Sequence, residues 1–171
     1  MTIRILALCG SLQAHSSNLE LLRTAVAAAP PGVEVVLFDG IRDLPLFNPD
    51  LEADPAPAAL QQWRRALEQS DALLIATPEY GYSLPGALKN AIDWTIGSAE
   101  LDRKIVAITA NVNHSERGRR GLKALRDTLG AANARIVADE PIVRGPTFEA
   151  EVVAVLKALA AAVEEQRREP R

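Results

Sequence analysis

The sequence contains, at residues 71–89, the stretch Asp71-Ala72-Leu73-Leu74-Ile75-Ala76-Thr77-Pro78-Glu79-Tyr80-Gly81-Tyr82-Ser83-Leu84-Pro85-Gly86-Ala87-Leu88-Lys89. Its apolar run predicts a buried β-strand, and Pro85 is well tolerated at the first position of a helix. Tyr80 and Tyr82 are therefore predicted to lie on a loop at the carboxyl end of a strand, where open α/β sheets bind ligands. Two aromatic residues close to prolines and glycines favour a stiff wall for a planar ring. The alternative is an ordinary turn whose tyrosines only pack.

A second loop with ligand-binding character lies near the start of the chain. Residues 3–8 predict a strand, and Leu19, Leu22 and Val26 follow at helical spacing, so residues 10–18 form the first βα loop. Its serines and its asparagine suit a phosphate held at the positive end of a helix dipole. Alternatively, Ser17 caps the helix in a capping box with Glu20, whose charge disfavours a phosphate. The two roles are compatible, because one serine can cap while others bind.

The rest of the chain alternates strands with helices. Strands are predicted at residues 33–38, 104–109 and 135–138, and helices around Leu60, Trp63 and Leu67; Leu122, Leu125 and Leu129; and Val152, Leu156, Leu159 and Val163. Five short strands with helical crossovers predict an α/β fold, a doubly wound five-stranded parallel sheet of order 2-1-3-4-5. The first and third strands then lie side by side, which brings the two loops together. We expect one domain over residues 1–171, a lid or partner surface at the proline-rich loop 40–57, and a solvated tail at 164–171.

Several common site types find no support in the sequence. No G-x-G-x-x-G follows the first strand, and the chain has no G-x-x-x-x-G-K-[ST] motif. Neither Ser11 nor Ser83 lies in a G-x-S-x-G elbow, which argues against a hydrolase. No acidic or histidine cluster has metal-ligand spacing, so no metal site is predicted, and His15 and His114 are interpreted as loop residues. Cys9, the only cysteine, is interpreted as a packing residue.

Two motifs of this chain resemble the signatures of the NADPH-dependent FMN reductase family, whose members have a flavodoxin-like fold and include quinone, chromate and azo-dye reductases. The first is Gly10-Ser11-Leu12 with Ser16 and Asn18; the second is Pro78-Glu79-Tyr80-x-Tyr82-Ser83-x-Pro85-Gly86-x-Leu88-Lys89-Asn90-x-Ile92-Asp93-Trp94. The resemblance implies that the FMN phosphate is held by Ser11, Gln13, Ser16, Ser17 and Asn18. It implies that the ribityl chain and isoalloxazine are lined by Pro78, Glu79, Tyr80, Gly81 and Tyr82. Gln13 and Gly81 stand where the family usually has arginine and asparagine, and the third loop lacks the usual glycines.

The resemblance also implies a reaction and an assembly. The reaction is ping-pong hydride transfer on FMN, with NADPH or NADH as donor, to quinones, azo compounds, metal oxyanions or free flavin, and it needs no catalytic side chain. The loop after the fourth strand, residues 110–121, offers Ser115, Arg117 and Arg119 to the NADPH phosphate, although a solvated helix start is the alternative. Homodimers or homotetramers are expected, with the helix at 85–97 near the interface and Trp94 and Ile96 as interface anchors or core residues.

Two other functions remain open from the sequence. One is a flavodoxin-type electron carrier with a protein partner, which the modest net charge of −3 disfavours because carriers usually present an acidic face. The other is a flavin-free regulatory or interaction protein with a degenerate site.

Composition narrows the range of partners and compartments. The net charge argues against nucleic acid as a partner, and no apolar run approaches membrane-spanning length. Met1 leads straight into the first strand without a signal peptide, so a cytoplasmic location and a small-molecule electron acceptor are expected.

Overall fold

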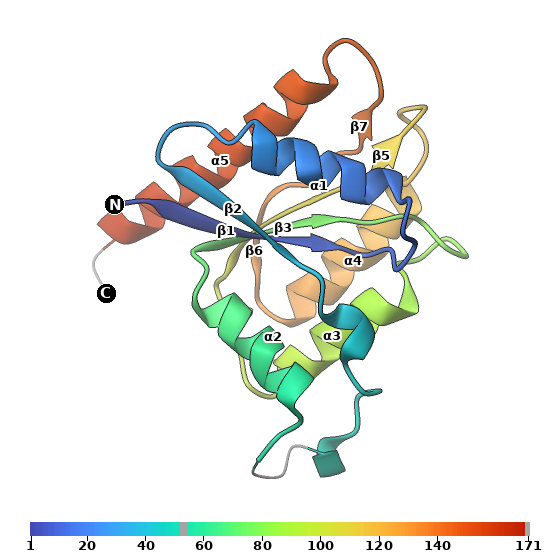
Figure 1. Ribbon diagram of the computed structural model, residues 1–171, viewed down its shortest axis with the longest axis vertical. Coiled ribbons are helices and arrows are strands. Elements are labelled where there is room, and N and C mark those ends of the chain that lie inside the picture. The colour runs from blue at the N-terminus through green and yellow to red at the C-terminus, as the bar shows by residue number, and fades with distance from the viewer. Residues whose placement is uncertain (52–54, 170–171) are drawn as a thin grey trace.

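The computed structural model describes residues 1–51 and 55–169, and Figure 1 shows their arrangement. The elements, in chain order, are β1 (Ile3–Cys9), α1 (Ser17–Ala27), β2 (Val33–Phe38), the 3₁₀ turns η1 (Ile41–Asp43) and η2 (Pro49–Leu51), α2 (Ala58–Glu68), β3 (Ala72–Ala76), α3 (Gly86–Ile96), β4 (Ile105–Thr109), β5 (Asn111–Val112), α4 (Arg119–Ala131), β6 (Arg135–Ala138), β7 (Ile142–Val143) and α5 (Phe148–Arg168). None of the helices in these described ranges has the length and apolar character needed to cross a membrane.

The central sheet has five parallel strands in the order β2-β1-β3-β4-β6. This confirms the predicted doubly wound topology, because β6 is the fifth strand of this sheet. The registers pair Ile5 with Val35 on one side and with Ala72 on the other, so β1 and β3 are neighbours and their carboxyl ends meet. A further parallel pair, β5 with β7, lies beyond the ends of β4 and β6 and was not predicted.

Helices cover both faces of the sheet, α1 and α5 on one and α2, α3 and α4 on the other (Figure 1). The predicted apolar faces of α2, α4 and α5 are buried as expected. In α1, however, the core contacts come from Leu21, Leu22 and Ala25, while Val26 is exposed. The prediction was right for Leu22 and wrong for Val26, because the sheet under the helix fixes which of its faces turns inward, and small Ala25 suits the close approach.

The loop between β2 and α2 is held against α3 at its centre. The carbonyl oxygen of Pro45 accepts hydrogen bonds from Asn90 Nδ2 (2.9 Å) and Trp94 Nε1 (2.8 Å). Phe47 packs edge-on against Trp94, with ring centroids 5.1 Å apart. Trp94 is fully buried and belongs to the core, so it is not available as an interface anchor, whereas Ile96 is 49% exposed. Residues 52–54 of the predicted lid or partner surface lie outside the described residues.

The charged end of the chain continues the last helix instead of forming a tail. Helix α5 runs to Arg168, because ion pairs hold its last turns to the sheet: Glu165 pairs with Arg135 (2.5 Å) and Arg167 with Asp71 (2.7 Å). Residues 164–168 are therefore helical and not a tail, although all of them except Gln166 are exposed to solvent as predicted. Residues 170–171 lie outside the described part of the chain.

Candidate functional site

A cleft of about 480 Å³ opens where the carboxyl ends of β3 and β4 meet the amino end of α1. It is lined by residues 17–18, 77–79, 82, 110–113, 116–118, 120 and 144. Both loops singled out from the sequence contribute to it, as does the loop between β4 and α4. The cleft therefore lies at the edge of the sheet where the topology predicts ligand binding, and its volume is within the usual range for a small-molecule site.

The first loop meets the third strand closely under the cleft. Gly10 N–H donates to the carbonyl of Ala76 (2.8 Å), and a Cβ on Gly10 would lie 2.4 Å from Thr77 Oγ1 and 2.8 Å from Thr77 Cβ. Only glycine therefore allows this approach.

Helix α1 is capped by Ser16, not by Ser17. Ser16 is nearly buried, and its Oγ accepts the N–H of Asn18 (3.2 Å). The capping box predicted at Ser17 is wrong, because Ser16 has the extended backbone (φ −76°, ψ 130°) that a cap residue needs, and the third helical residue is then Leu19, which has no polar group to reach back. The side chain of Ser17 is thereby left at the mouth of the cleft, at the amino end of the helix.

A chain of hydrogen bonds ties this helix end to the two strands that were not predicted. Asn111 N–H donates to Asn18 Oδ1 (2.9 Å), and Asn111 Nδ2 donates to the carbonyl of Ser17 (2.7 Å). Arg144 Nε donates to Asn111 Oδ1 (3.1 Å). The sequence analysis missed Asn111 and Arg144. The sequence did contain a signal for Asn111, since an amide residue soon after a buried strand is typical of a binding site. It contained no such signal for Arg144.

The second loop forms a tight turn at the tip of residues 77–83. Tyr80 and Ser83 exchange two backbone hydrogen bonds of 3.0 Å, and the residues between them have positive φ, 56° at Gly81 and 62° at Tyr82. Tyr82 lines the cleft and remains 69% exposed, whereas Tyr80, 55% exposed, and Gly81 lie outside the cleft wall. A non-glycine residue at positive φ is strained, and such strain often marks functional sites.

This turn is fastened to the start of α4 by two contacts. Glu79 Oε2 accepts the N–H of Gly121 (2.9 Å), and the Arg120 guanidinium lies 4.1 Å from the centre of the Tyr82 ring. A Cβ on Gly121 would come within 3.0 Å of Glu79 Cβ, so this glycine permits the contact. The carboxylate is favourably placed, because the first turn of a helix carries positive partial charge. Glu79 thus positions the tyrosine turn against α4.

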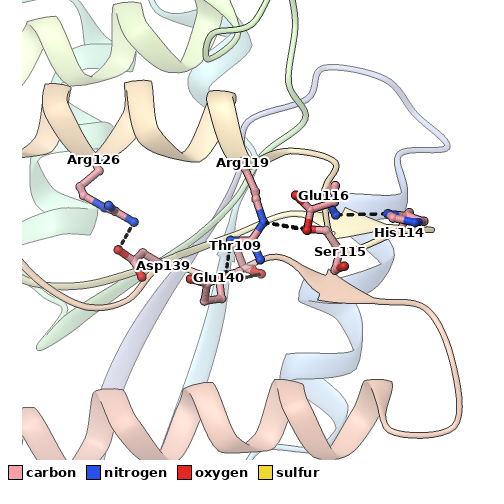
Figure 2. A network of polar contacts seen from close by, with 8 residues as sticks. All are labelled: Thr109, His114, Ser115, Glu116, Arg119, Arg126, Asp139 and Glu140. Carbon is pink, nitrogen blue, oxygen red and sulfur yellow. Dashed lines mark hydrogen bonds and ion pairs between the residues drawn. The ribbon is translucent and has the colours of Figure 1, made fainter.

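Of the three residues predicted to hold the NADPH phosphate, Arg117 alone lines the cleft. Arg119 does not line it; it donates to the carbonyl of Ser115 (2.9 Å) and pairs with Glu140 (2.8 Å), as Figure 2 shows. Ser115 does not line the cleft. Arg117 has Arg120 as its cationic neighbour in the cleft wall.

The residues predicted for the cofactor are likewise divided. Ser17, Asn18, Pro78, Glu79 and Tyr82 line the cleft. Ser11 and Gln13 line a smaller recess of about 300 Å³ on the β2 side of the first loop. Three guanidinium groups, those of Arg117, Arg120 and Arg144, face the cleft against two carboxylates, one of which, on Glu79, is already hydrogen-bonded. The cleft is therefore suited to an anionic ligand with a flat, partly apolar portion.

Comparison with known proteins agrees with this chemistry. The model of the family described as NADPH-dependent FMN reductase matches residues 3–160. The chain belongs to this family. The matched residues include every described strand and helix except the last turns of α5.

Two curated proteins are similar to this chain in sequence, and one solved structure is similar to it in fold. An NAD(P)H-dependent FMN reductase of Pseudomonas aeruginosa is 46% identical over 92 residues, which are 54% of this chain and 49% of the relative. A quinone reductase of Escherichia coli is 40% identical over 93 residues, 54% of this chain and 50% of the relative. These alignments span about half the length of the curated relatives. The flavoenzyme NAD(P)H:acceptor oxidoreductase FerB of Paracoccus denitrificans superposes with a TM-score of 0.81 at 26% identity, covering 96% of this chain and 98% of that chain.

Proposed function

We propose that this protein is an FMN-dependent NAD(P)H oxidoreductase that reduces small electron acceptors, quinones first among them, in ping-pong order. The observation that carries the proposal is the meeting of loops 10–18 and 77–83 in one cleft at the switch point of a family-matched sheet. FMN held in this cleft would supply the chemistry of hydride and electron transfer. The protein's share is binding, orientation and electrostatics.

The phosphate of FMN is proposed to bind at the amino end of α1, among Ser11, Gln13, Ser16, Ser17 and Asn18. The donor set fits a phosphate: the helix end provides backbone N–H groups and a positive partial charge, and the serines provide hydroxyl donors. The Ser16 hydroxyl accepts the N–H of Asn18, which leaves its own proton to donate.

The isoalloxazine is proposed to lie along Pro78 and Tyr82, with Glu79, Tyr80 and Gly81 shaping the turn. The pair of hydrogen bonds in this turn uses the N–H groups of Tyr80 and Ser83, so those of Gly81 and Tyr82 take no part in it. Amides of this kind, fixed in direction by a tight turn, stabilise negative charge that develops on a reduced ring. The hydrogen bond from Gly121 N–H to Glu79 Oε2 holds this turn, and with it the two amides, in place.

NAD(P)H and the acceptor are proposed to enter in turn over the same ring, beside the loop that precedes α4. Arg117 and Arg120 are the residues we propose for the dinucleotide phosphates, since both line the cleft. We assign Ser115 and Arg119 a supporting role, because Arg119 is occupied by Glu140 and the Ser115 carbonyl. The choice between NADPH and NADH, the homodimer or homotetramer, and the cytoplasmic location stay predictions; Ile96 is the exposed candidate for the interface.

Anaerobic spectroscopy of the purified full chain tests the proposal. We expect visible flavin absorbance after incubation with FMN and gel filtration, bleaching on addition of NADPH without any partner protein, and recovery of the absorbance with benzoquinone. Bleaching that requires a separate reductase would instead indicate an electron carrier. A chain that retains no FMN after gel filtration and releases no heat when FMN is titrated would overturn the proposal.

A further inference from the structure

The first loop lacks the positive side chain that a phosphate monoester usually attracts. Residues 10–18 include no lysine or arginine, and the first turn of α1 adds the carboxylate of Glu20. A phosphate monoester carries a charge of about −2 at neutral pH. Helix-end amides and hydroxyl groups leave much of that charge unbalanced, so a cation from another part of the chain would strengthen the site.

Arg144 is connected to this helix end by hydrogen bonds through one side chain. Its Nε is bonded to Asn111 Oδ1 (3.1 Å), and the Nδ2 of the same amide is bonded to the carbonyl of Ser17 (2.7 Å). One asparagine side chain therefore separates the guanidinium from the first residue of α1. The bond through Nε leaves the two terminal NH₂ groups of the guanidinium for other acceptors, and these are the pair that match phosphate oxygens as a fork.

The surroundings of Arg144 also relate it to the helix end. It lines the main cleft together with Ser17 and Asn18, and it lines an adjoining recess of about 370 Å³ together with Glu20. Its charge thus offsets the carboxylate that disfavours an anion there. The other two arginines of the cleft belong to the start of α4, and Arg120 is stacked on Tyr82.

We propose that Arg144 supplies the positive charge for the phosphate of the bound flavin nucleotide and thereby selects FMN over riboflavin. The inference rests on the proposed function. Arg144 directly follows β7, the short strand that pairs with β5, and Asn111 is the first residue of β5. The small second sheet therefore positions both the arginine and the asparagine that holds it.

Flavin affinity measured with and without the phosphate tests the proposal. FMN and riboflavin are titrated into the flavin-free full chain, with flavin fluorescence or heat as the signal. Arg144→Ala is expected to lower the affinity for FMN about tenfold and to leave that for riboflavin unchanged, because only FMN has the charged group. Arg144→Lys keeps the charge but loses the fork, and is expected to lose about threefold for FMN.

Matched variants separate this role from a structural one. Arg126→Ala removes the same charge from α4, where Arg126 pairs with Asp139, and is expected to change neither affinity. An equal loss of FMN and riboflavin affinity in Arg144→Ala would mean that Arg144 only supports Asn111, and would overturn the proposal, as would no loss of either. If Arg144→Ala fails to fold, judged by its circular dichroism melt, Arg144→Lys and Arg144→Gln decide by the same ratio. A wild-type chain that binds neither flavin would instead refute the proposed function.

Discussion

The two ends of the central sheet carry hollows of similar size but with a different balance of charge. At the amino end of the strands, a hollow of about 530 Å³ is lined by residues 71, 100, 102–104, 166–167 and 169. At the carboxyl end, the candidate site measures about 480 Å³. The larger hollow is therefore the one without the family motifs, and volume alone does not identify the site.

Charges at the amino end are matched by fixed partners. Lys104 Nζ donates to the carbonyls of Leu67 (2.8 Å) and Ser70 (2.7 Å), where α2 ends. Asp71 accepts the N–H of Arg4 (2.9 Å) and pairs with Arg167 (2.7 Å). The carboxyl end differs, since it presents Arg117, Arg120 and Arg144 along an open cleft, whereas positive φ occurs at both ends, 62° at Tyr82 and 55° at Arg103. The comparison teaches that the charges of one end are paired within the protein, whereas the other end keeps an excess of guanidinium groups along its cleft.

The largest effect is expected where the two loops of the cleft touch. Gly10→Ala places a methyl group 2.4 Å from Thr77 Oγ1 and 3.0 Å from Leu88 Cδ2, so one of the two loops must move. We expect a loss of about 3 kcal/mol in the free energy of unfolding and a strong loss of FMN affinity. Urea denaturation and FMN titration measure the two.

Gly130→Ala is the control for this prediction, because a Cβ there meets nothing within 4 Å and alanine is the better helix former. It should raise stability slightly and leave FMN binding unchanged. A Gly10→Ala variant as stable as the wild type would show that the loops are free to separate, and that the cleft is not fixed by this contact.

Much of the fold was predictable from the sequence because the signals are local. The buried strands are apolar runs bounded by polar residues, and the order of the five strands follows from the handedness of their crossovers. The pair of β5 and β7 has two residues in each strand, too few for any periodicity. Those strands form because Asn111 and Ile142 are brought together by the ends of β4 and β6, which is a tertiary effect.

The site was predictable only in part, for a related reason. The motif residues around 78–82 and 16–18 come from turns whose chemistry is visible in the sequence. Which of two adjacent serines caps α1 depends on backbone angles that the sequence leaves open. The direction of Arg119 depends on Glu140, and that of Arg144 on Asn111, each more than twenty residues away in the chain. Long-range pairs of this kind carry no local pattern.

A smaller effect, confined to stability, is expected at the amino end. Lys104→Met removes two charge-assisted hydrogen bonds, and although the Leu67 carbonyl keeps the hydroxyl of Ser70 as a donor (2.8 Å), the loss should cost about 2 kcal/mol of unfolding free energy. FMN affinity should stay unchanged, because the site lies at the other end of the strands. Urea denaturation and FMN titration, run in parallel, measure both. Weaker FMN binding in this variant would break the division between the two ends.

The pH dependence of the same variant sharpens the test. Burial lowers the pKa of Lys104 below its ordinary value of 10.5, although Asp71 and Glu68 act to raise it. The unfolded chain therefore binds the proton more tightly than the folded one. Between the lowered pKa and 10.5 the folded protein has lost this proton while the unfolded chain still holds it, so the free energy of unfolding rises with pH. The stability advantage of the wild type over Lys104→Met should widen in that window. A constant difference between the two proteins would show that the ammonium is not penalised.

The smallest effect on stability, with the opposite sign, is expected at Tyr82. Glycine suits the second central position of a turn in which both central residues have positive φ. Tyr82→Gly removes strain of roughly 1–3 kcal/mol, and loses a cation–π contact with Arg120 of about 0.5–1 kcal/mol and some backbone entropy. The net gain should be about 0.5 kcal/mol, seen as a higher urea midpoint. FMN affinity should fall about fivefold, since a stacking wall is lost.

Tyr80→Ala, outside the cleft wall and at ordinary φ, is the matched control and should show no gain in stability. A change that makes the protein more stable and a poorer binder at once is what a strained binding turn requires; equal FMN affinity in Tyr82→Gly would place the flavin ring elsewhere.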